Sequence, residues 1–281
     1  MLPFKVDLND KVVVITGGGG VICSAIASAV AECGGKVAIL DLNKEAADKV
    51  ANEITSKGYI AQGFECNVLD LKSIEDCHDL IVKAYGKCDI LINGAGGNNA
   101  KATTDNEYAE LDDEIKNIKT FFDLDKSGIE FVFNLNFLGT LLPSQVFGKD
   151  MINRKGCSIL NISSMNAFTP LTKIPAYSGA KAAVSNFTKW LAVHFSHLGI
   201  RVNAIAPGFF STTQNAKLLW NDDGSPTSRT EKILESTPMR RFGEVNDLIG
   251  PTLFLLSEEA SGFVTGVILP IDGGFSSYSG V

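Results

Sequence analysis

Tyr177 and Lys181 lie four residues apart in the segment YSGAK, so on a helix their side chains share one face. A phenol has a pKa of about 10 and is a poor base at neutral pH. An ammonium within roughly 4–6 Å favours the phenolate, which is the tuning that a general acid/base needs. The spacing therefore indicates a proton-transfer pair. The alternative is that Tyr177 is an ordinary core ring.

Two further polar residues precede this pair in the chain. Ser164 closes the apolar run CSILNISS, and Asn136 lies in FNLNFLGT. Each has a simpler interpretation, because a serine can cap the end of a strand and an asparagine can sit at a kink inside a helix. The residues alone do not decide between these interpretations and a place in the same site as Tyr177 and Lys181.

A glycine-rich segment, TGGGGVIC, begins at Thr16 between the apolar run KVVVI and the alanine-rich stretch SAIASAVAE. This order predicts a strand, a tight turn and a helix. Glycines in such a turn let the backbone approach a pyrophosphate, which then sits at the positive end of the helix. The turn alone is weak evidence for a nucleotide site, because tight turns need glycine anyway.

Asp41 ends the next apolar run, KVAILD, about 20 residues beyond the glycines. A carboxylate at that place can accept both hydroxyls of an adenosine ribose and would repel a 2′-phosphate. No arginine follows it, and Lys44 is the nearby cation. The sequence therefore predicts NAD as the cofactor in preference to NADP. The alternative is that Asp41 merely caps the following helix.

Short apolar runs alternate with helical patterns almost throughout the chain. Runs that are apolar on both faces and joined by helices are typical of a parallel sheet covered on both sides. We therefore predict one doubly wound (Rossmann) α/β domain over residues 1–281, with a mostly parallel sheet. The predicted strands lie in KVVVITG, KVAILDL, IAQGFEC, CDILINGAG, CSILNISS, IRVNAIAPG and GVILPIDGG.

A polar insertion at about 97–130 interrupts this alternation. Within it, residues 105–130 hold nine acidic and three basic side chains. A solvated helix is the default expectation for such a charged run. An insertion after a strand's carboxyl end can also form a substrate lid, so that interpretation stays open.

The composition excludes several classes of function. A net charge of −7 argues against nucleic acid or an anionic membrane surface as a partner. No apolar run approaches the roughly 20 residues that span a bilayer. The opening MLPFKVDLNDK lacks the plan of a secretory signal, and the six cysteines are scattered, so we expect a cytoplasmic protein with reduced thiols. His194 and His197 have no third ligand in view, and no metal site is expected.

These motifs together resemble the short-chain dehydrogenase/reductase family over nearly the full chain. The family's usual turn is T-G-x-x-x-G-x-G, and here Val21 and Cys23 replace its later glycines unless the alignment shifts by one residue to use Gly20. By this resemblance, Tyr177 exchanges the substrate proton, Ser164 hydrogen-bonds the substrate oxygen, and Asn136 holds a relay water. Lys181 lowers the pKa of Tyr177 and holds the nicotinamide ribose.

The family motifs also imply which residues contact the dinucleotide. Asn93-Gly94-Ala95-Gly96 resembles the family's N-N-A-G, and Asn67-Val68 stands where the family often has D-V. Pro207-Gly208 followed by Thr212 resembles the family's segment that meets the nicotinamide. The implied cofactor-binding residues are Gly17, Gly19, Gly20, Val21, Ile22, Asp41, Asn67, Val68, Asn93, Ala95, Gly96, Tyr177, Lys181, Pro207, Gly208 and Thr212.

The expected pocket rim is rich in amides, hydroxyls and lysines, which suit a small polyhydroxylated acid. The candidate substrate residues are Asn99, Lys101, Asn166 and Lys173, with one of the lysines as a carboxylate anchor. The alternative is that these groups simply face water. Longer segments such as GGNNAKATTDNE and SSMNAFTPLTKIPAYSGAK resemble sugar-acid oxidoreductases within the family.

Three broader questions stay open on the sequence alone. The chain could act on another sugar acid or polyol, such as gluconate. It could also be a catalytically silent dinucleotide sensor on the same fold, although a sensor has no need for the four catalytic residues. By family resemblance a homotetramer is expected, with the ending FSSYSGV near a subunit contact or else a disordered terminus.

Overall fold

Seven strands form one sheet in the order β3-β2-β1-β4-β5-β6-β7, and each pairing of neighbours is parallel. The computed structural model describes residues 6–113, 116–212 and 216–280. All seven predicted strands are confirmed, within the doubly wound α/β fold that was expected. Their bounds are β1 Val12–Thr16, β2 Lys36–Asp41, β3 Ala61–Glu65, β4 Ile90–Asn93, β5 Ser158–Ile162, β6 Arg201–Pro207 and β7 Ile268–Ile271.

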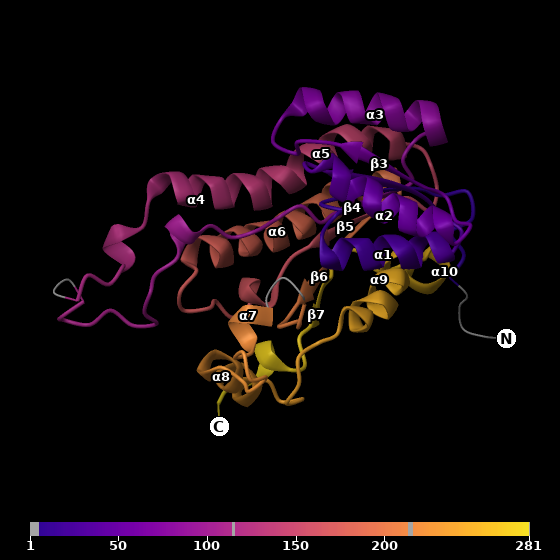
Figure 1. The fold of residues 1–281 in the computed structure, drawn as a ribbon. Coiled ribbons are helices and arrows are strands. Elements are labelled where there is room, and N and C mark those ends of the chain that lie inside the picture. Colours follow the sequence, from indigo (N-terminus) through magenta and orange to yellow (C-terminus); the bar gives the residue numbers. More distant parts are fainter. Residues whose placement is uncertain (1–5, 114–115, 213–215, 281) are drawn as a thin grey trace.

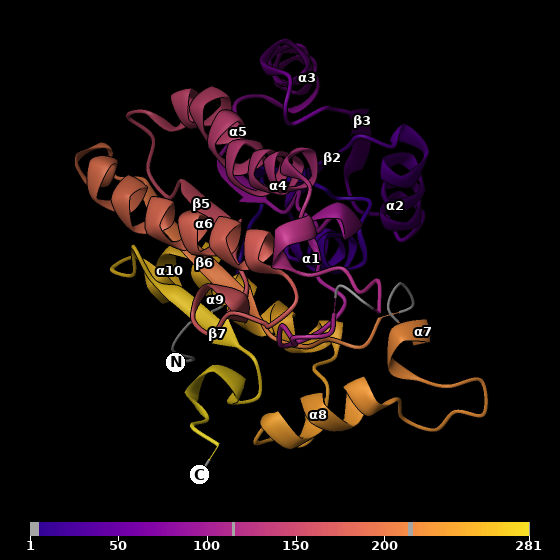
Figure 2. The same ribbon diagram turned by 90° about the vertical axis from the view of Figure 1, so that its left-hand side faces the viewer.

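Helices cover both faces of the sheet (Figures 1 and 2). On β1, Val13 and Ile15 pack with α1, α2 and α9, whereas Val12 and Val14 pack with α3, α5 and α6. This period of two buries both faces of a strand that is apolar throughout. The covering helices are α1 Val21–Glu32, α2 Lys44–Ser56, α9 Ile249–Leu256, α3 Leu71–Tyr85, α5 Gly139–Phe147 and α6 Pro175–His194.

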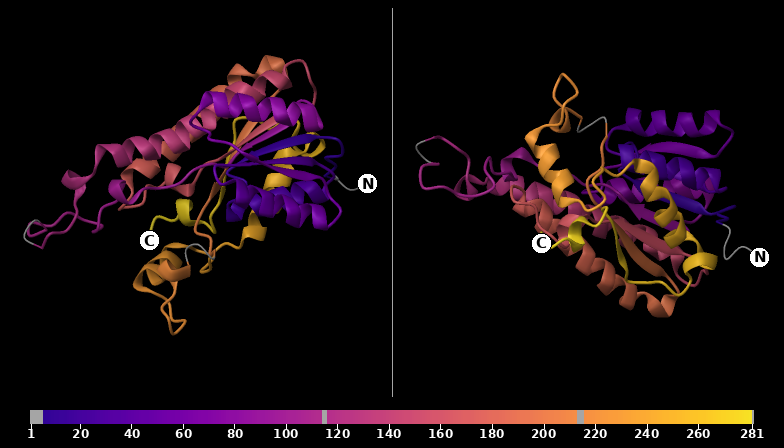
Figure 3. Two further views of the ribbon diagram at one scale, coloured as in Figure 1. Left: turned by 45° about the horizontal axis from the view of Figure 1, so that its top comes forward. Right: turned by 90° about the horizontal axis from the view of Figure 1, so that it is seen from below.

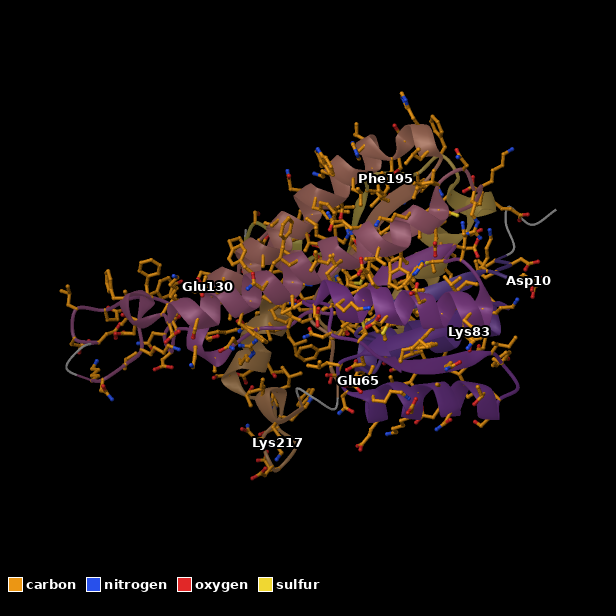
Figure 4. All side chains as sticks on the ribbon, turned by 90° about the horizontal axis from the view of Figure 1, so that it is seen from above. Asp10, Glu65, Lys83, Glu130, Phe195 and Lys217 are labelled. Atoms are coloured by element: carbon orange, nitrogen blue, oxygen red, sulfur yellow. The ribbon has the colours of Figure 1, made fainter. Side chains whose placement is uncertain are left out.

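The strand order reverses at β1, which pairs with β2 on one side and β4 on the other. In open parallel sheets a ligand binds in the crevice beyond the carboxyl ends of the strands at such a reversal. Helices α7 Ala216–Leu219 and α8 Ser228–Ser236 lie beyond this end of the sheet, whereas α10 Glu258–Ser261 lies toward the opposite end (Figure 1). In Figure 4, Glu130 and Lys217 mark the carboxyl end, and Asp10 and Lys83 the opposite one.

The insertion after β4 extends away from the sheet as an arm that returns to α4 Lys126–Phe133 (Figure 3). The expectation of a solvated helix is wrong for its described residues before Lys126, where the helical segments are the short 3-10 turns Ala100–Ala102 and Phe121–Asp123. Its aspartates explain this difference. Asp105 accepts a hydrogen bond from the Lys119 N–H, and Asp113 accepts one from the Glu110 N–H. Such side-chain bonds to the backbone compete with a helix.

No helix in the described ranges is long and apolar enough to cross a bilayer. The same ranges hold no cluster of His, Cys, Asp or Glu side chains that could bind a metal ion. Five of the six cysteines are buried and Cys33 is half-buried, all of them as free thiols.

Candidate active site

Asn136 sits inside a π-helical turn, Asn134–Leu138, between α4 and α5. The fully buried side chain donates to the Val132 carbonyl at 2.8 Å and to the Gly97 carbonyl at 2.7 Å, and its Oδ1 accepts from the Gly97 N–H at 3.3 Å. The interpretation as a helix irregularity is confirmed, and the asparagine also ties the helix to the loop after β4. Its catalytic role stays a prediction. Such π-turns occur often at functional sites.

Ser164 follows β5 and caps a short turn, Met165–Ala167, by accepting a hydrogen bond from the Asn166 N–H at 3.2 Å. Its side chain is buried and also shares a hydrogen bond with Tyr177. The cap and the site interpretation of Ser164 are therefore compatible.

Tyr177 and Lys181 lie in the first two turns of α6, which begins at Pro175. The Lys181 Nζ lies 5.7 Å from the centre of the Tyr177 ring and donates to the Ile162 carbonyl at 2.8 Å. Burial lowers the pKa of Lys181 to about 8, opposed by the smaller electrostatic effect of Cys23. The predicted face-sharing of the two side chains is present in the structure.

Burial raises the pKa of Tyr177 above its usual value, and the hydrogen bond with Ser164 opposes that rise. Lys181 is itself desolvated and donates a hydrogen bond to the Ile162 carbonyl of β5. Its effect on the pKa of Tyr177 stays a prediction.

A cavity of about 510 Å³ opens beside the glycine-rich turn at the carboxyl ends of β1 and β4. Asp41 lies at its edge, and its carboxylate accepts from the Gly19 N–H at 3.0 Å and the Asn43 N–H at 2.9 Å. Asn43, not Asp41, caps α2, so the helix-cap alternative for Asp41 is wrong. The predicted cofactor residues that line this cofactor cleft are Gly17, Gly20, Val21, Ile22, Asp41, Ala95, Gly96, Gly208 and Thr212.

The departure from the usual glycine pattern has a steric counterpart at Gly94. A Cβ on Gly94 would lie 2.2 Å from the Cys23 Sγ and 2.8 Å from the Thr16 carbonyl oxygen. The cysteine therefore occupies the space that a side chain at Gly94 would need. Gly17 is required for a different reason, since it has φ +64° and a Cβ there would lie 2.8 Å from Ala95.

The remaining predicted cofactor residues support the cleft without lining it. Asn93 is buried and donates to Ser144 Oγ and Asn161 Oδ1, at 3.0 and 2.9 Å. After β3, the Asn67 side chain accepts from the Leu69 N–H. Val68 is buried and lies close to Gly139, and Pro207 ends β6 in the core.

The four candidate substrate residues divide into two groups. Asn166 is buried next to Ser164, and its Oδ1 finds no hydrogen-bond partner in the described chain. Lys173 lines a second cavity, and its Nζ donates to the Asp105 carbonyl. Asn99 instead caps the turn that contains Lys101, and neither residue lines the two cavities. The structure thus places Lys101 outside the pocket.

The second cavity has a volume of about 640 Å³ and is called the substrate-side cavity below. It is bounded by the insertion, by the loop before α6 and by α8. Sequence reasoning missed three residues that line both cavities, and these are Phe209, Arg229 and Ile233. Thr16 was also missed as a support, because its Oγ1 accepts from the N–H groups of Gly94 and Ala95.

A parallel sheet with a glycine-lined cleft, beside a buried serine and lysine and a half-buried tyrosine, defines a dinucleotide-binding oxidoreductase of the doubly wound α/β class. The family model for short chain dehydrogenases matches residues 11–223. The chain belongs to the short-chain dehydrogenase family.

Three relatives extend this comparison. A crystal structure of a Haemophilus influenzae protein, described provisionally as a D-mannonate oxidoreductase and holding NAD, is 61% identical with a TM-score of 0.95, covering 98% of each chain. An oxidoreductase of Bacillus subtilis named UxuB is 51% identical over all of both chains. A gluconate 5-dehydrogenase of Burkholderia cenocepacia, solved with NADP and tartrate, is 28% identical with a TM-score of 0.83, covering 99% of this chain and 100% of that one.

Proposed function

We propose that this protein is an NAD-dependent oxidoreductase that interconverts D-mannonate and D-fructuronate. The observation that carries the proposal is the cluster of buried Ser164 and Lys181 with half-buried Tyr177, in which Ser164 hydrogen-bonds Tyr177 and Lys181 lies one helical turn away. The Haemophilus influenzae relative with bound NAD supports the choice of cofactor and substrate.

The residues of the cleft fit a dinucleotide. Gly17, Gly20, Gly94 and Gly96 line the cleft, and glycines at such strand ends let a pyrophosphate approach the backbone closely. Asp41 is fixed by two backbone N–H groups and keeps its carboxylate at the cleft edge. It would bind the ribose hydroxyls of NAD and repel the 2′-phosphate of NADP, so NAD is the proposed cofactor.

In the proposed reaction the bound nicotinamide accepts or returns a hydride at the substrate carbon. Tyr177 takes the proton of the substrate hydroxyl as its C–H bond breaks, and the hydroxyl carbon becomes a ketone. Ser164 hydrogen-bonds the same oxygen while charge develops on it. In the reverse direction Tyr177 gives the proton back to the carbonyl oxygen.

Lys181 and Asn136 would position the cofactor and a water molecule for this step. Lys181 would hold the nicotinamide ribose, and Asn136 would hold a water that connects the lysine to solvent. Gly96 lies between them, since a Cβ there would be 2.7 Å from Asn136 Oδ1 and 3.2 Å from Lys181 Nζ. The amide and the amine therefore face one another across a glycine.

A sugar acid suits the polar groups on the substrate side. The unpartnered Oδ1 of buried Asn166 is an acceptor that a substrate hydroxyl can satisfy. The substrate-side cavity also carries three cations, in a chain whose net charge is −7. We propose that the substrate is D-mannonate, oxidised at the C5 hydroxyl.

The test is an absorbance assay of NADH formation with NAD and NADP in parallel, on D-mannonate, D-gluconate and neutral polyols. We expect the highest kcat/KM with D-mannonate and NAD. Higher kcat/KM with gluconate would move the assignment to that sugar acid. Absence of turnover across the panel, with NAD binding shown by calorimetry, would favour the dinucleotide sensor.

We also propose a homotetramer. Helix α6 leaves Trp190 and Val193 exposed, and Trp190 stacks on His194 with ring centres 4.7 Å apart. An exposed apolar helix face of this kind is typical of a subunit contact. Light scattering should give four times the 30.0 kDa chain mass, and Trp190→Asp should shift the protein to smaller species. A monomeric parent protein would contradict the proposal.

A further inference from the structure

Three cations surround the substrate-side cavity, one from the loop before α6 and two from α8. Lys173, Arg229 and Lys232 line it together with the carboxylates Glu107 and Glu110. Lys232 lowers the pKa of Glu107 most strongly, and Lys173 and Arg229 contribute in the same direction. All three cations therefore lie near the Glu107 carboxylate of the insertion.

Two of these cations are already engaged within the protein. Lys232 Nζ donates to Glu107 at 2.8 Å, and this ion pair connects α8 to the insertion. Lys173 Nζ donates to the Asp105 carbonyl and so connects the loop before α6 to the same insertion. Their positive charges therefore serve to hold the walls of the cavity together.

Arg229 differs from both lysines. It is exposed, and it makes no hydrogen bond or ion pair with any residue in the ranges that the structure describes. Arg201 shows what a structural arginine does in this chain, because it is buried and donates to the carbonyls of Leu255 and Leu256 and to the side chains of Ser261 and Glu258. No comparable partner holds the Arg229 guanidinium.

Arg229 lies where the two cavities meet. Arg229 and Ile233 lie one turn apart on α8, and both line the cofactor cleft as well as the substrate-side cavity. Phe209, which follows β6, borders the same two spaces. Arg229 therefore borders both the cofactor cleft and the cavity next to it.

We propose that Arg229 binds the carboxylate of the sugar acid and selects acids over neutral polyols. The proposal rests on the proposed function and deepens it. A guanidinium presents a planar pair of N–H donors that matches a carboxylate in a bidentate manner, which an ammonium cannot do. Glu107 and Glu110 in the lining disfavour a second anionic group, so the site fits a monocarboxylate with hydroxyls along the rest of the chain.

The test compares steady-state kinetics of the full chain and of Arg229→Gln and Arg229→Lys, at saturating NAD. We expect Arg229→Gln to raise KM for D-mannonate by about 10- to 100-fold, because a charge-assisted bidentate contact is lost. We expect kcat and KM for NAD to change by less than about threefold, and Arg229→Lys to recover part of the loss. Lys101→Ala and Lys173→Ala should raise KM for D-mannonate less than Arg229→Gln does.

Arg240→Gln is the matched control. Arg240 is an exposed arginine just after α8 that donates to the Leu234 carbonyl and lines neither the cofactor cleft nor the substrate-side cavity. Its substitution should leave KM for D-mannonate unchanged. Melting curves of all variants establish that each one folds.

Three results would overturn the Arg229 proposal. These are an unchanged KM for the acid, a rise in KM for NAD instead, and a larger rise for either lysine variant. If the parent protein prefers another sugar acid, the D-mannonate assignment fails, and the same comparison is made on that acid. If it oxidises only neutral polyols, the carboxylate anchor fails as well.

Discussion

The cofactor cleft and the substrate-side cavity meet at α8 but are built in opposite ways. Glycine backbone forms one side of the cleft, and a single Cβ at Gly17 or Gly94 would collide with Ala95 or with the Cys23 Sγ. The substrate-side cavity is lined by side chains from four segments far apart in the sequence, and it is held together by the Lys232–Glu107 ion pair and the Lys173 hydrogen bond to Asp105.

This difference teaches where the chain tolerates change. A steric constraint acts on every substitution at a glycine, because close-packed atoms leave no space for a methyl group. An exposed ion pair contributes little to stability, so its residues can change with little effect on folding. In the proposed function, catalysis depends on the close-packed cleft, and specificity depends on the cavity held by exposed polar contacts.

Tyr177→Phe probes the chemistry at the junction of the two halves and should have the largest effect. Removing the phenol oxygen removes the proton acceptor, so we expect kcat to fall by about 10²- to 10⁴-fold. The affinity for NAD, measured by calorimetry, should change little because the ring stays in place. A variant that turns over D-mannonate at the parent rate would contradict the assignment of Tyr177.

Lys181→Met tests whether the rigid half is built at the expense of stability. The pKa of Lys181 is lowered from 10.5 to about 8, so the penalty for burying the charged form is complete below about pH 8 and disappears toward pH 10.5. We therefore compare the free energy of unfolding of the variant with that of the parent. The value for the variant minus that for the parent should be larger at pH 7 than at pH 10, by about 2–3 kcal/mol.

Denaturant unfolding of the cofactor-free proteins at the two pH values measures this difference. Losses that do not depend on pH, such as the hydrogen bond to the Ile162 carbonyl, cancel in the comparison. An equal stability difference at both pH values would show that the lysine is not desolvated as the structure indicates.

Gly94→Ala tests the shared space beneath the cofactor cleft. The added Cβ would meet the Cys23 Sγ and the Thr16 carbonyl oxygen, and we expect the free energy of unfolding to fall by about 1–3 kcal/mol. Adding Cys23→Gly to the same chain should recover part of that loss. If the double variant is as unstable as the sum of the single changes, the two positions do not share the space.

Glu107→Gln breaks the connection between the insertion and α8 and should have the smallest effect. Both partners of the ion pair are solvent-accessible, with exposed fractions of 33% for Glu107 and 65% for Lys232. We expect the melting temperature to change by less than about 4 °C, and the change to shrink at high salt. A larger loss would mean that the insertion is needed for folding.

The sequence predicted the rigid half of the site well. Apolar runs place the seven strands, and Asp41 and the glycines mark the strand ends where the structure has its cleft. These features leave a local signal, because burial and tight turns restrict residue types over a few neighbouring positions. The same end of the sheet holds the four predicted catalytic residues Asn136, Ser164, Tyr177 and Lys181. Their roles stay predictions.

The substrate side left no such signal. Arg229 is one exposed cation in a polar segment, and its significance depends on Glu107 and Lys173, which lie more than fifty residues away in the sequence. The fit of Cys23 against Gly94 is equally invisible, because each residue departs from the family pattern at a separate motif. The acidic insertion also misled, since aspartates that bond to backbone N–H groups form turns from a composition that favours a helix.

Gly96 sets a limit on how this catalyst can diversify. Its missing methyl group leaves an open passage between the amide of Asn136 and the amine of Lys181. Substitutions on α8 can change substrate specificity without altering this contact. An alanine at position 96 would place a methyl group between the Asn136 amide and the Lys181 amine, and we expect turnover to fall for every substrate.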